Sequence, residues 1–182
     1  MIDWSFPKHC LGVMIFPKNT FTAVSEHHNE RHVISLSMIF GLLFARQIMH
    51  SENHDLVFYV VTALASGVGF VYFAGFFLSW LIRIGGSVLA TPAKMRSVLS
   101  YAFVPYILAL SLLALSRVGV LPKTSAIAFF FIVLSWGLAV FGIKTVSEIK
   151  TLQALFVMVV PVAALVLIIA ILYKIAWVIW GY

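Results

Sequence analysis

The chain has 182 residues, of which 63% are hydrophobic and 10% charged, whereas a soluble domain carries about a quarter charged residues. A water-soluble fold cannot bury so much apolar surface, so the composition predicts that lipid surrounds most of this protein. The formal charge of +6 would favour a nucleic acid partner in a soluble protein. Here the Lys and Arg residues lie almost entirely between the apolar runs, where they set membrane topology, so no nucleic acid partner is expected.

Residues 1–32 come before the first long apolar run and are expected to form a cytoplasmic N-terminal segment. They show no signal peptide, because the short apolar run 10–16 is followed at once by Pro17 and Lys18. Pro17 marks the first turn of a predicted short interfacial helix, and the alternative is a disordered tail. The side chains expected to rest this helix on the lipid headgroups are Phe16, Phe21 and Val24, with Trp4 and Phe6 upstream.

The apolar runs predict five transmembrane helices, because a helix needs about 20 residues to cross about 30 Å of hydrocarbon. The runs do not alternate apolar and polar residues, which excludes the strands of a membrane barrel. The expected fold class is an all-α integral membrane protein whose residues 33–182 form a bundle of five helices. The predicted spans are 33–49, 56–84, 98–116, 126–143 and 152–180, with a sixth span as the alternative if the last run is divided at Pro161.

The basic residues predict how the five spans are oriented. The N-terminal segment and the loops after the second and fourth spans carry eight Lys and Arg, and the other side carries four. The positive-inside rule then places the N-terminus in the cytoplasm.

Two histidine pairs have the spacing of metal ligands, His28 with His32 and His50 with His54. Residues four apart share one helix face, and two imidazoles at this spacing can bind one zinc ion. The sequence lacks the His-Glu-x-x-His pattern of metalloproteases, and the two pairs lie on opposite sides of the membrane in this topology. Solvated surface histidines are therefore the favoured interpretation, and no metal or other cofactor is expected.

All six acidic residues lie outside the predicted spans. Ion-coupled transporters usually mark their path with carboxylates inside the membrane, and intramembrane enzymes need a base beside a nucleophile or paired carboxylates. The sequence therefore predicts a protein that is not an enzyme.

The second span carries a stripe of polar and small residues on one helical face. Such a stripe commonly marks where neighbouring helices approach and form hydrogen bonds, and the functional alternative is the lining of a narrow pathway. Ala65 with Gly69 also permits self-association. The stripe consists of Tyr59, Thr62, Ser66, Gly69, Tyr72 and Ser79, and also contains Phe76 and Arg83.

With these segments in place, the chain resembles the Yip family, the Ypt/Rab-interacting membrane proteins, in its bacterial branch. The resemblance rests on the segment 16–21 (FPKNTF), on Gly85-Gly86 closing a long second span, on the segment 97–105 (SVLSYAFVP) opening the third, and on 136–144 before the last apolar run. It implies a five-helix membrane domain with a cytoplasmic N-terminus and no catalytic activity. The long polar N-terminal tail of the eukaryotic relatives is missing, which argues against a GTPase partner and for a bacterial inner membrane.

The leading functional hypothesis is a non-catalytic scaffold or adaptor in membrane organisation or trafficking. Its basic loop after the second span is expected to dock anionic lipid or a protein partner. The alternative is a small channel, transporter or lipid-handling protein with a pathway along the second span. The residues of the predicted docking loop are Arg83, Gly85, Gly86, Lys94 and Arg96.

Overall fold

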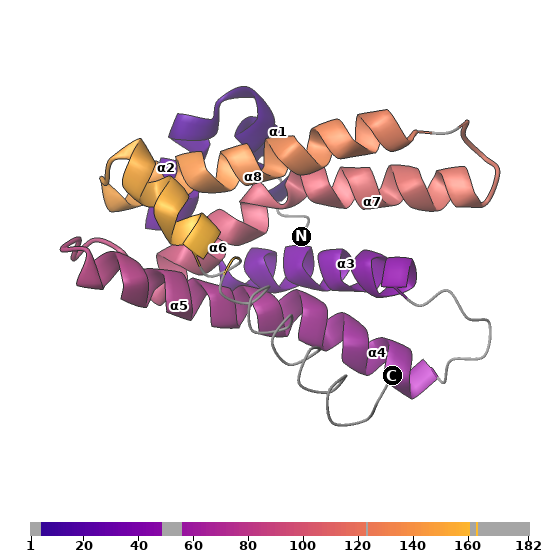
Figure 1. Ribbon diagram of the computed structural model, residues 1–182, viewed down its shortest axis with the longest axis horizontal. Coiled ribbons are helices and arrows are strands. Elements are labelled where there is room, and N and C mark those ends of the chain that lie inside the picture. The colour runs from indigo at the N-terminus through magenta and orange to yellow at the C-terminus, as the bar shows by residue number, and fades with distance from the viewer. Residues whose placement is uncertain (1–4, 49–55, 123, 161–162, 164–182) are drawn as a thin grey trace, which may run out of the picture.

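The computed structural model describes residues 5–48, 56–122, 124–160 and 163, and the regular elements within them are helices. Helices α4, η1 and α5 follow one another without a break, and η1 is a single π-helical turn. The long helices lie side by side along the long axis of the molecule (Figure 1). The helices are α1 (Ser5–Ile15), α2 (Pro17–Glu26), α3 (Glu30–Ile48), α4 (Leu56–Leu64), η1 (Ala65–Gly69), α5 (Phe70–Ile84), α6 (Pro92–Ala102), α7 (Val104–Arg117), α8 (Ser125–Ser147) and the helix Thr151–Val160.

Three helical stretches are long and apolar enough to cross a membrane: Leu56–Ile84, Pro92–Arg117 and Ser125–Ser147. They contain the second, third and fourth predicted spans. The first predicted span falls in α3, a 19-residue helix with polar residues at both ends. The fifth begins in the apolar helix Thr151–Val160 and then runs mostly outside the described residues. Those two spans stay predictions.

Long helices that follow one another in the chain run antiparallel, whereas α3 runs parallel to α6 and α7. Tyr59 Oη donates to the Leu42 carbonyl and Tyr72 Oη to Glu30, so α3 runs opposite to α4 and α5. Thr124 Oγ1 donates to the Leu112 carbonyl, which pairs the end of α7 with the start of α8. Three segments predicted to share one side of the membrane do meet at one end of the bundle: α1 with α2, the α5–α6 connection, and the end of α8. We call this the N-terminal end.

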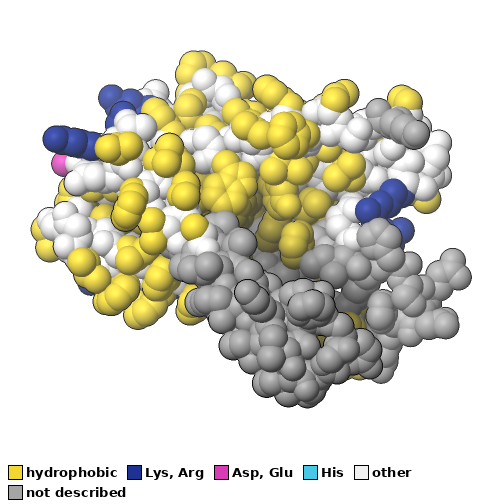
Figure 2. All heavy atoms as spheres, viewed as in Figure 1, with side chains coloured by type: hydrophobic (Ala, Val, Ile, Leu, Met, Phe, Trp, Pro, Cys, Tyr) yellow, Lys and Arg dark blue, Asp and Glu magenta, His cyan; other side chains and the backbone are white. Residues whose placement is uncertain are grey.

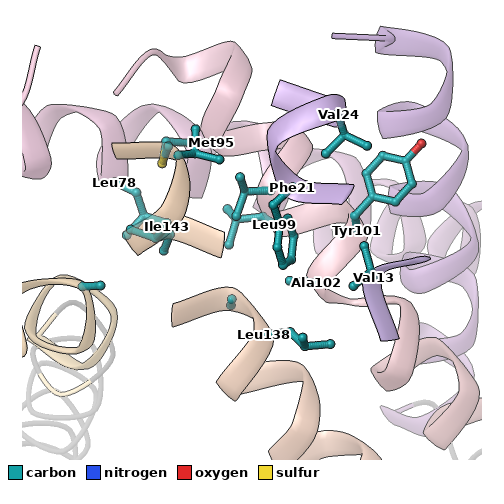
Figure 3. Packing of buried hydrophobic residues seen from close by; sticks show 14 of the residues in the cluster. Val13, Phe21, Val24, Leu78, Met95, Leu99, Tyr101, Ala102, Leu138 and Ile143 are labelled. Carbon is teal, nitrogen blue, oxygen red and sulfur yellow. The ribbon is translucent and has the colours of Figure 1, made fainter. Parts of the chain in front are cut away.

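The interior of the N-terminal end is built around α2. Phe21 points into the bundle beside Leu99 of α6 (Figure 3), and Val24 belongs to the same buried cluster. Phe21 is fully buried and Val24 is 3% exposed, whereas Phe16 is 65% exposed. The prediction of a short helix after Pro17 is confirmed. The expected contact of Phe21 and Val24 with lipid headgroups is wrong, because these side chains fill the space between α6 and α8.

The third predicted span is broken at Phe103, which separates α6 from α7. Pro105 lacks a backbone N–H and therefore cannot continue the ladder of helix hydrogen bonds. The carbonyl that loses this donor is that of Tyr101, four residues earlier. The neighbouring carbonyl of Ala102 accepts a hydrogen bond from Ser135 Oγ of α8 at 2.6 Å. The bend thus presents a backbone acceptor to the neighbouring helix and locks the two together in the apolar interior.

Candidate functional site

Polar side chains from four segments meet where the start of α3 packs against α5 and α6. They come from the α2–α3 turn, α3, α5 and α6, and positions 42 to 69 apart in the sequence become direct neighbours. We call this group the polar cluster. Its members are His28, Glu30, His32, Tyr72, Arg96, Ser97 and Tyr101.

The turn between α2 and α3 positions the first three members. Asn29 Oδ1 accepts a hydrogen bond from the backbone N–H of Arg31 at 3.1 Å, as a helix N-cap does. Glu30 follows in the first turn of α3, where a negative charge is favoured by the helix dipole. The capped turn therefore holds the Glu30 carboxylate against α5 and α6.

Both oxygens of Glu30 are engaged. Oε1 lies 2.5 Å from the Arg96 guanidinium and 2.9 Å from His28 Nε2, and Oε2 accepts a hydrogen bond from Tyr72 Oη at 2.7 Å. The Arg96 guanidinium also lies over the Tyr72 ring, 4.5 Å from its centroid, in a cation–π contact. One carboxylate thereby joins α3 to α5 and α6.

These contacts decide the charge of the carboxyl group. Burial raises the pKa of Glu30, but the contacts with His28, Tyr72 and Arg96 together outweigh it and lower the pKa from 4.5 to about 2. Glu30 is therefore ionised at neutral pH, which suits a permanent ion pair and does not suit a general acid.

The two histidines bridge the same helices. His28 Nδ1 lies 2.6 Å from Ser97 Oγ, and His32 Nδ1 lies 2.8 Å from Tyr101 Oη. Because the Asn29 amide oxygen already faces the Arg31 N–H, its Nδ2 donates to His32 Nε2 at 3.2 Å. Nε2 of this imidazole is then the acceptor, and Nδ1 donates toward the Tyr101 oxygen.

The ring nitrogens of the predicted metal candidates, His28 and His32, thus all lie next to protein groups. Across the part of the chain that the structure describes, no group of three or more His, Cys, Asp or Glu side chains has a geometry suited to a metal ion. The second pair, His50 with His54, lies outside the described residues.

Helix α1 packs against the buried side of the cluster. The Phe6 ring meets His32 edge-on at 5.0 Å between centroids, and the His9 ring meets Tyr101 at 5.9 Å. Cys10, on the same helix, is partly buried, and this burial raises the pKa of its thiol to about 11. Such a thiol is poorly reactive at neutral pH.

The stripe on the second span does not form one surface. Tyr59 and Tyr72 contact α3, and Ser79 is buried with its hydroxyl bonded to the Phe76 carbonyl. Ser66 bonds to the carbonyl of Thr62 within its own helix. Gly69 and Phe76 are exposed, so the close approach of a neighbouring helix that was expected along the stripe does not occur at these two residues.

That close contact is made by Gly67 and Gly41. A Cβ atom added at either glycine would overlap backbone atoms of the opposite helix, so α3 and η1 touch through their backbones. The π-helical turn brings Gly67, rather than Gly69, to face α3.

The predicted docking loop is divided by the structure. Arg96 is not in the loop: it lies on α6 inside the polar cluster, with a side chain 19% exposed. Lys94 lies in the first turn of the same helix, capped by Thr91 Oγ1. Arg83 remains at the surface but donates from Nε to the Ala90 carbonyl at 2.8 Å, across the turn that contains Gly85 and Gly86. Glu30 and Tyr72 already surround the Arg96 guanidinium, and its contact with an external partner stays a prediction.

Sequence reasoning missed the polar cluster because its members are ordinary polar residues in separate segments. Glu30 lies ahead of the predicted first span, as expected, yet its carboxylate contacts Tyr72 in the middle of the helix Leu56–Ile84. Two features of the sequence could have indicated the polar cluster: an acidic residue next to one predicted span and a single Arg at the start of another. An ionisable residue beside a membrane span calls for a partner.

Comparison with known proteins identifies the family. No curated protein and no solved structure gives a significant match to the chain. The family model described as the Yip1 domain matches residues 11–173, which include the helices α2 to α8 and the polar cluster. This confirms the resemblance seen in the sequence, and the chain is therefore a multi-pass membrane protein that belongs to the Yip1 domain family.

Proposed function

We propose that this protein is a non-catalytic scaffold or adaptor of the bacterial inner membrane, with its N-terminus in the cytoplasm. One observation carries the proposal: the chemically capable groups of the polar cluster are used to hold helices together. Each oxygen of Glu30 and each ring nitrogen of His28 and His32 lies within 3.2 Å of another protein group. Such a cluster stabilises the N-terminal end rather than offering a base or nucleophile to a substrate.

The N-terminal end offers a surface for a partner. Its exposed charged side chains include four basic and two acidic residues, so the surface is positive, and the face between the two basic ends of the molecule is largely apolar (Figure 2). A positive surface on a rigid platform favours a protein partner with an acidic face, and it steers the encounter electrostatically. The basic residues are Lys18, Arg31, Arg83 and Lys150, and the acidic residues are Glu26 and Glu148.

The test replaces Arg83 and Lys150 together with glutamine and recovers the cross-linked protein from native membranes. The matched control replaces the exposed Arg46 and Arg117 with glutamine at the opposite end of the bundle. We expect at least one associated protein to be lost from this double variant and retained by the control. An unchanged set of associated proteins would count against this surface as the docking site.

The π-helical turn favours a second candidate function, a small channel, transporter or lipid-handling protein with its pathway along the second span. Such turns are frequent at functional sites, and this one lies between Thr62 and Tyr72 of the stripe. The assay measures flux of ions, small metabolites and fluorescent lipids into proteoliposomes. Transport that is abolished by Thr62→Leu with Ser66→Leu would favour this function over the scaffold.

A further inference from the structure

Two hydrogen bonds between α8 and the broken helix α6–α7 show how deep Ala102 lies in the hydrocarbon layer. Thr124 Oγ1 meets the Leu112 carbonyl, and Ser135 Oγ meets the Ala102 carbonyl. Ser135 is ten residues into α8, about 15 Å along the helix axis at a rise of 1.5 Å per residue. Ala102 is 15 residues before Arg117, the end of α7, which is about 22 Å. With Arg117 at one boundary of a hydrocarbon layer about 30 Å thick, Ala102 lies inside the layer, about 8 Å from its boundary on the N-terminal side.

Helix α1 contacts the bundle at this depth. Its His9 ring packs on Tyr101, the neighbour of Ala102, with 5.9 Å between centroids. Val13 is fully buried and belongs to the same cluster as Ala102 and Leu138, beside which it points in Figure 3. Helix α1 also contacts α7, which is part of the candidate span Pro92–Arg117. Helix α1 thus lies farther from the N-terminal end of the bundle than α2 does. Phe21 of α2 packs near Gly142 and Val98, which are closer to that end.

The outward face of α1 is apolar. Leu11 and Ile15, four residues apart on one helical face, are each 63% exposed, and Phe16 next to them is 65% exposed. Lys8 and Lys18 flank this face and are exposed as well. An apolar face between two lysines is the pattern of a helix that rests in the acyl chains while its lysines reach the lipid phosphates.

We propose that α1 is a half-inserted helix, embedded in the hydrocarbon of the leaflet on the N-terminal side, and that phospholipid acyl chains cover Leu11, Ile15 and Phe16. Lys8 and Lys18 bind the phosphates of the same leaflet. The depth of Tyr101 and Ala102 and the charge of the two lysines identify lipid as the occupant of this face. The N-terminal segment then belongs to the membrane domain and is not an aqueous tail.

The chain's lone cysteine makes a depth measurement direct. Cys10→Ala supplies a cysteine-free background, into which Leu11→Cys, Ile15→Cys, His27→Cys or Val133→Cys is introduced and labelled with an environment-sensitive fluorophore. His27, exposed at the end of α2, is the aqueous control, and Val133, exposed on α8, is the lipid control. Each variant is reconstituted in phosphatidylglycerol–phosphatidylethanolamine vesicles and quenched by acyl-chain spin labels or by aqueous iodide.

We expect the probes at positions 11 and 15 to match the probe at 133, with several-fold stronger quenching by the spin-labelled lipid than by iodide, and the probe at 27 to show the reverse. Iodide quenching at 11 and 15 equal to that at 27 would overturn the proposal. A second measurement avoids the bulky probe, because unlabelled Leu11→Cys should resist an impermeant maleimide added to both sides of the vesicles, whereas His27→Cys should react with it. Rapid reaction with the impermeant reagent would likewise refute the insertion of α1.

Discussion

At the N-terminal end, the charge and the contacts of a single residue depend on neighbours far away in the sequence. Glu30 is partly exposed, with 40% of its side chain accessible, yet three groups from three segments, His28, Tyr72 and Arg96, converge on it. An exposed ion pair is worth little, whereas a networked pair with hydrogen bonds to a third group is worth more. The contribution of Glu30 therefore depends on Arg96 and Tyr72 acting together.

A double-mutant cycle on Glu30→Gln and Arg96→Gln measures this dependence. We expect each single variant to be destabilised and the double variant to lose less than the sum, with a coupling energy of about 1 kcal/mol for residues in one network. The measurement is unfolding of the purified protein in detergent, with the exposed Lys150→Gln as the control. Strict additivity would show that the ion pair contributes nothing beyond its separate members.

The pH dependence of stability follows from the same carboxylate. Its pKa is lowered from 4.5 to about 2 in the folded protein, so the folded state favours the ionised form. This stabilisation is fully present above about pH 4.5 and is lost as the pH falls from about 4.5 toward about 2. We expect the difference in Tm between the wild type and Glu30→Gln to be constant from pH 7 to 5 and to shrink below pH 4.5. A difference that grew on acidification would contradict the assigned pKa.

At the scale of helices, two backbone contacts determine how the elements cross. The carbonyl of Ala102, at the break before Pro105, accepts a hydrogen bond from Ser135 and joins α6 to α8. Gly41 and Gly67 let α3 approach η1 until their backbones touch. Small residues at such crossings replace the hydrophobic driving force that lipid cannot supply between helices.

Gly41→Ala tests the second contact. The added Cβ would overlap the Ala63 carbonyl oxygen and lie 2.9 Å from Gly67 Cα, with no flexible side chain to move aside. We expect the free energy of unfolding to fall by roughly 1–3 kcal/mol, the usual cost of overpacking. Gly137→Ala is the matched control, because a Cβ at that position on α8 meets no atom within 4 Å. Equal stability of the two variants would exclude the close crossing.

For the whole molecule, the segments with most of the basic residues gather at one end. Ser87 Oγ, on the α5–α6 connection, donates to the Ser147 carbonyl at the end of α8 at 2.7 Å, and α2 packs on both α6 and α8. Gly119, on the α7–α8 connection, lies at the opposite end, because Thr124 and Leu112 pair there. This arrangement matches the sides predicted from the charge count.

Cysteine accessibility in whole cells tests the orientation. In the Cys10→Ala background, His27→Cys should be protected from an impermeant maleimide and Gly119→Cys should react, because the positive-inside rule places the N-terminal end in the cytoplasm. Disrupting the cells should expose His27→Cys and leave Gly119→Cys unchanged. Labelling of His27→Cys in intact cells would reverse the topology.

The order of the helices and the family were predictable from the sequence because both depend on local properties. Runs of apolar residues about 20 long, the Pro17 start of α2 and the Gly85 end of α5 act within a few residues of themselves. The fully buried position of Phe21 was not predictable, since an aromatic residue ahead of a first span suits a lipid surface and a protein interior equally well.

The sequence by itself determined that this is an all-helical membrane protein of the Yip1 domain family, with most of its basic residues outside the apolar runs. Only the tertiary structure decided that Glu30, Tyr72 and Arg96 meet, that Gly67 rather than Gly69 makes the close crossing, and that α1 packs beside Tyr101. The physical reason is that apolar periodicity shows which segments enter lipid but not which helix faces touch. Those contacts depend on the rotation and depth of each helix, and here a π-helical turn and a break before a proline set both.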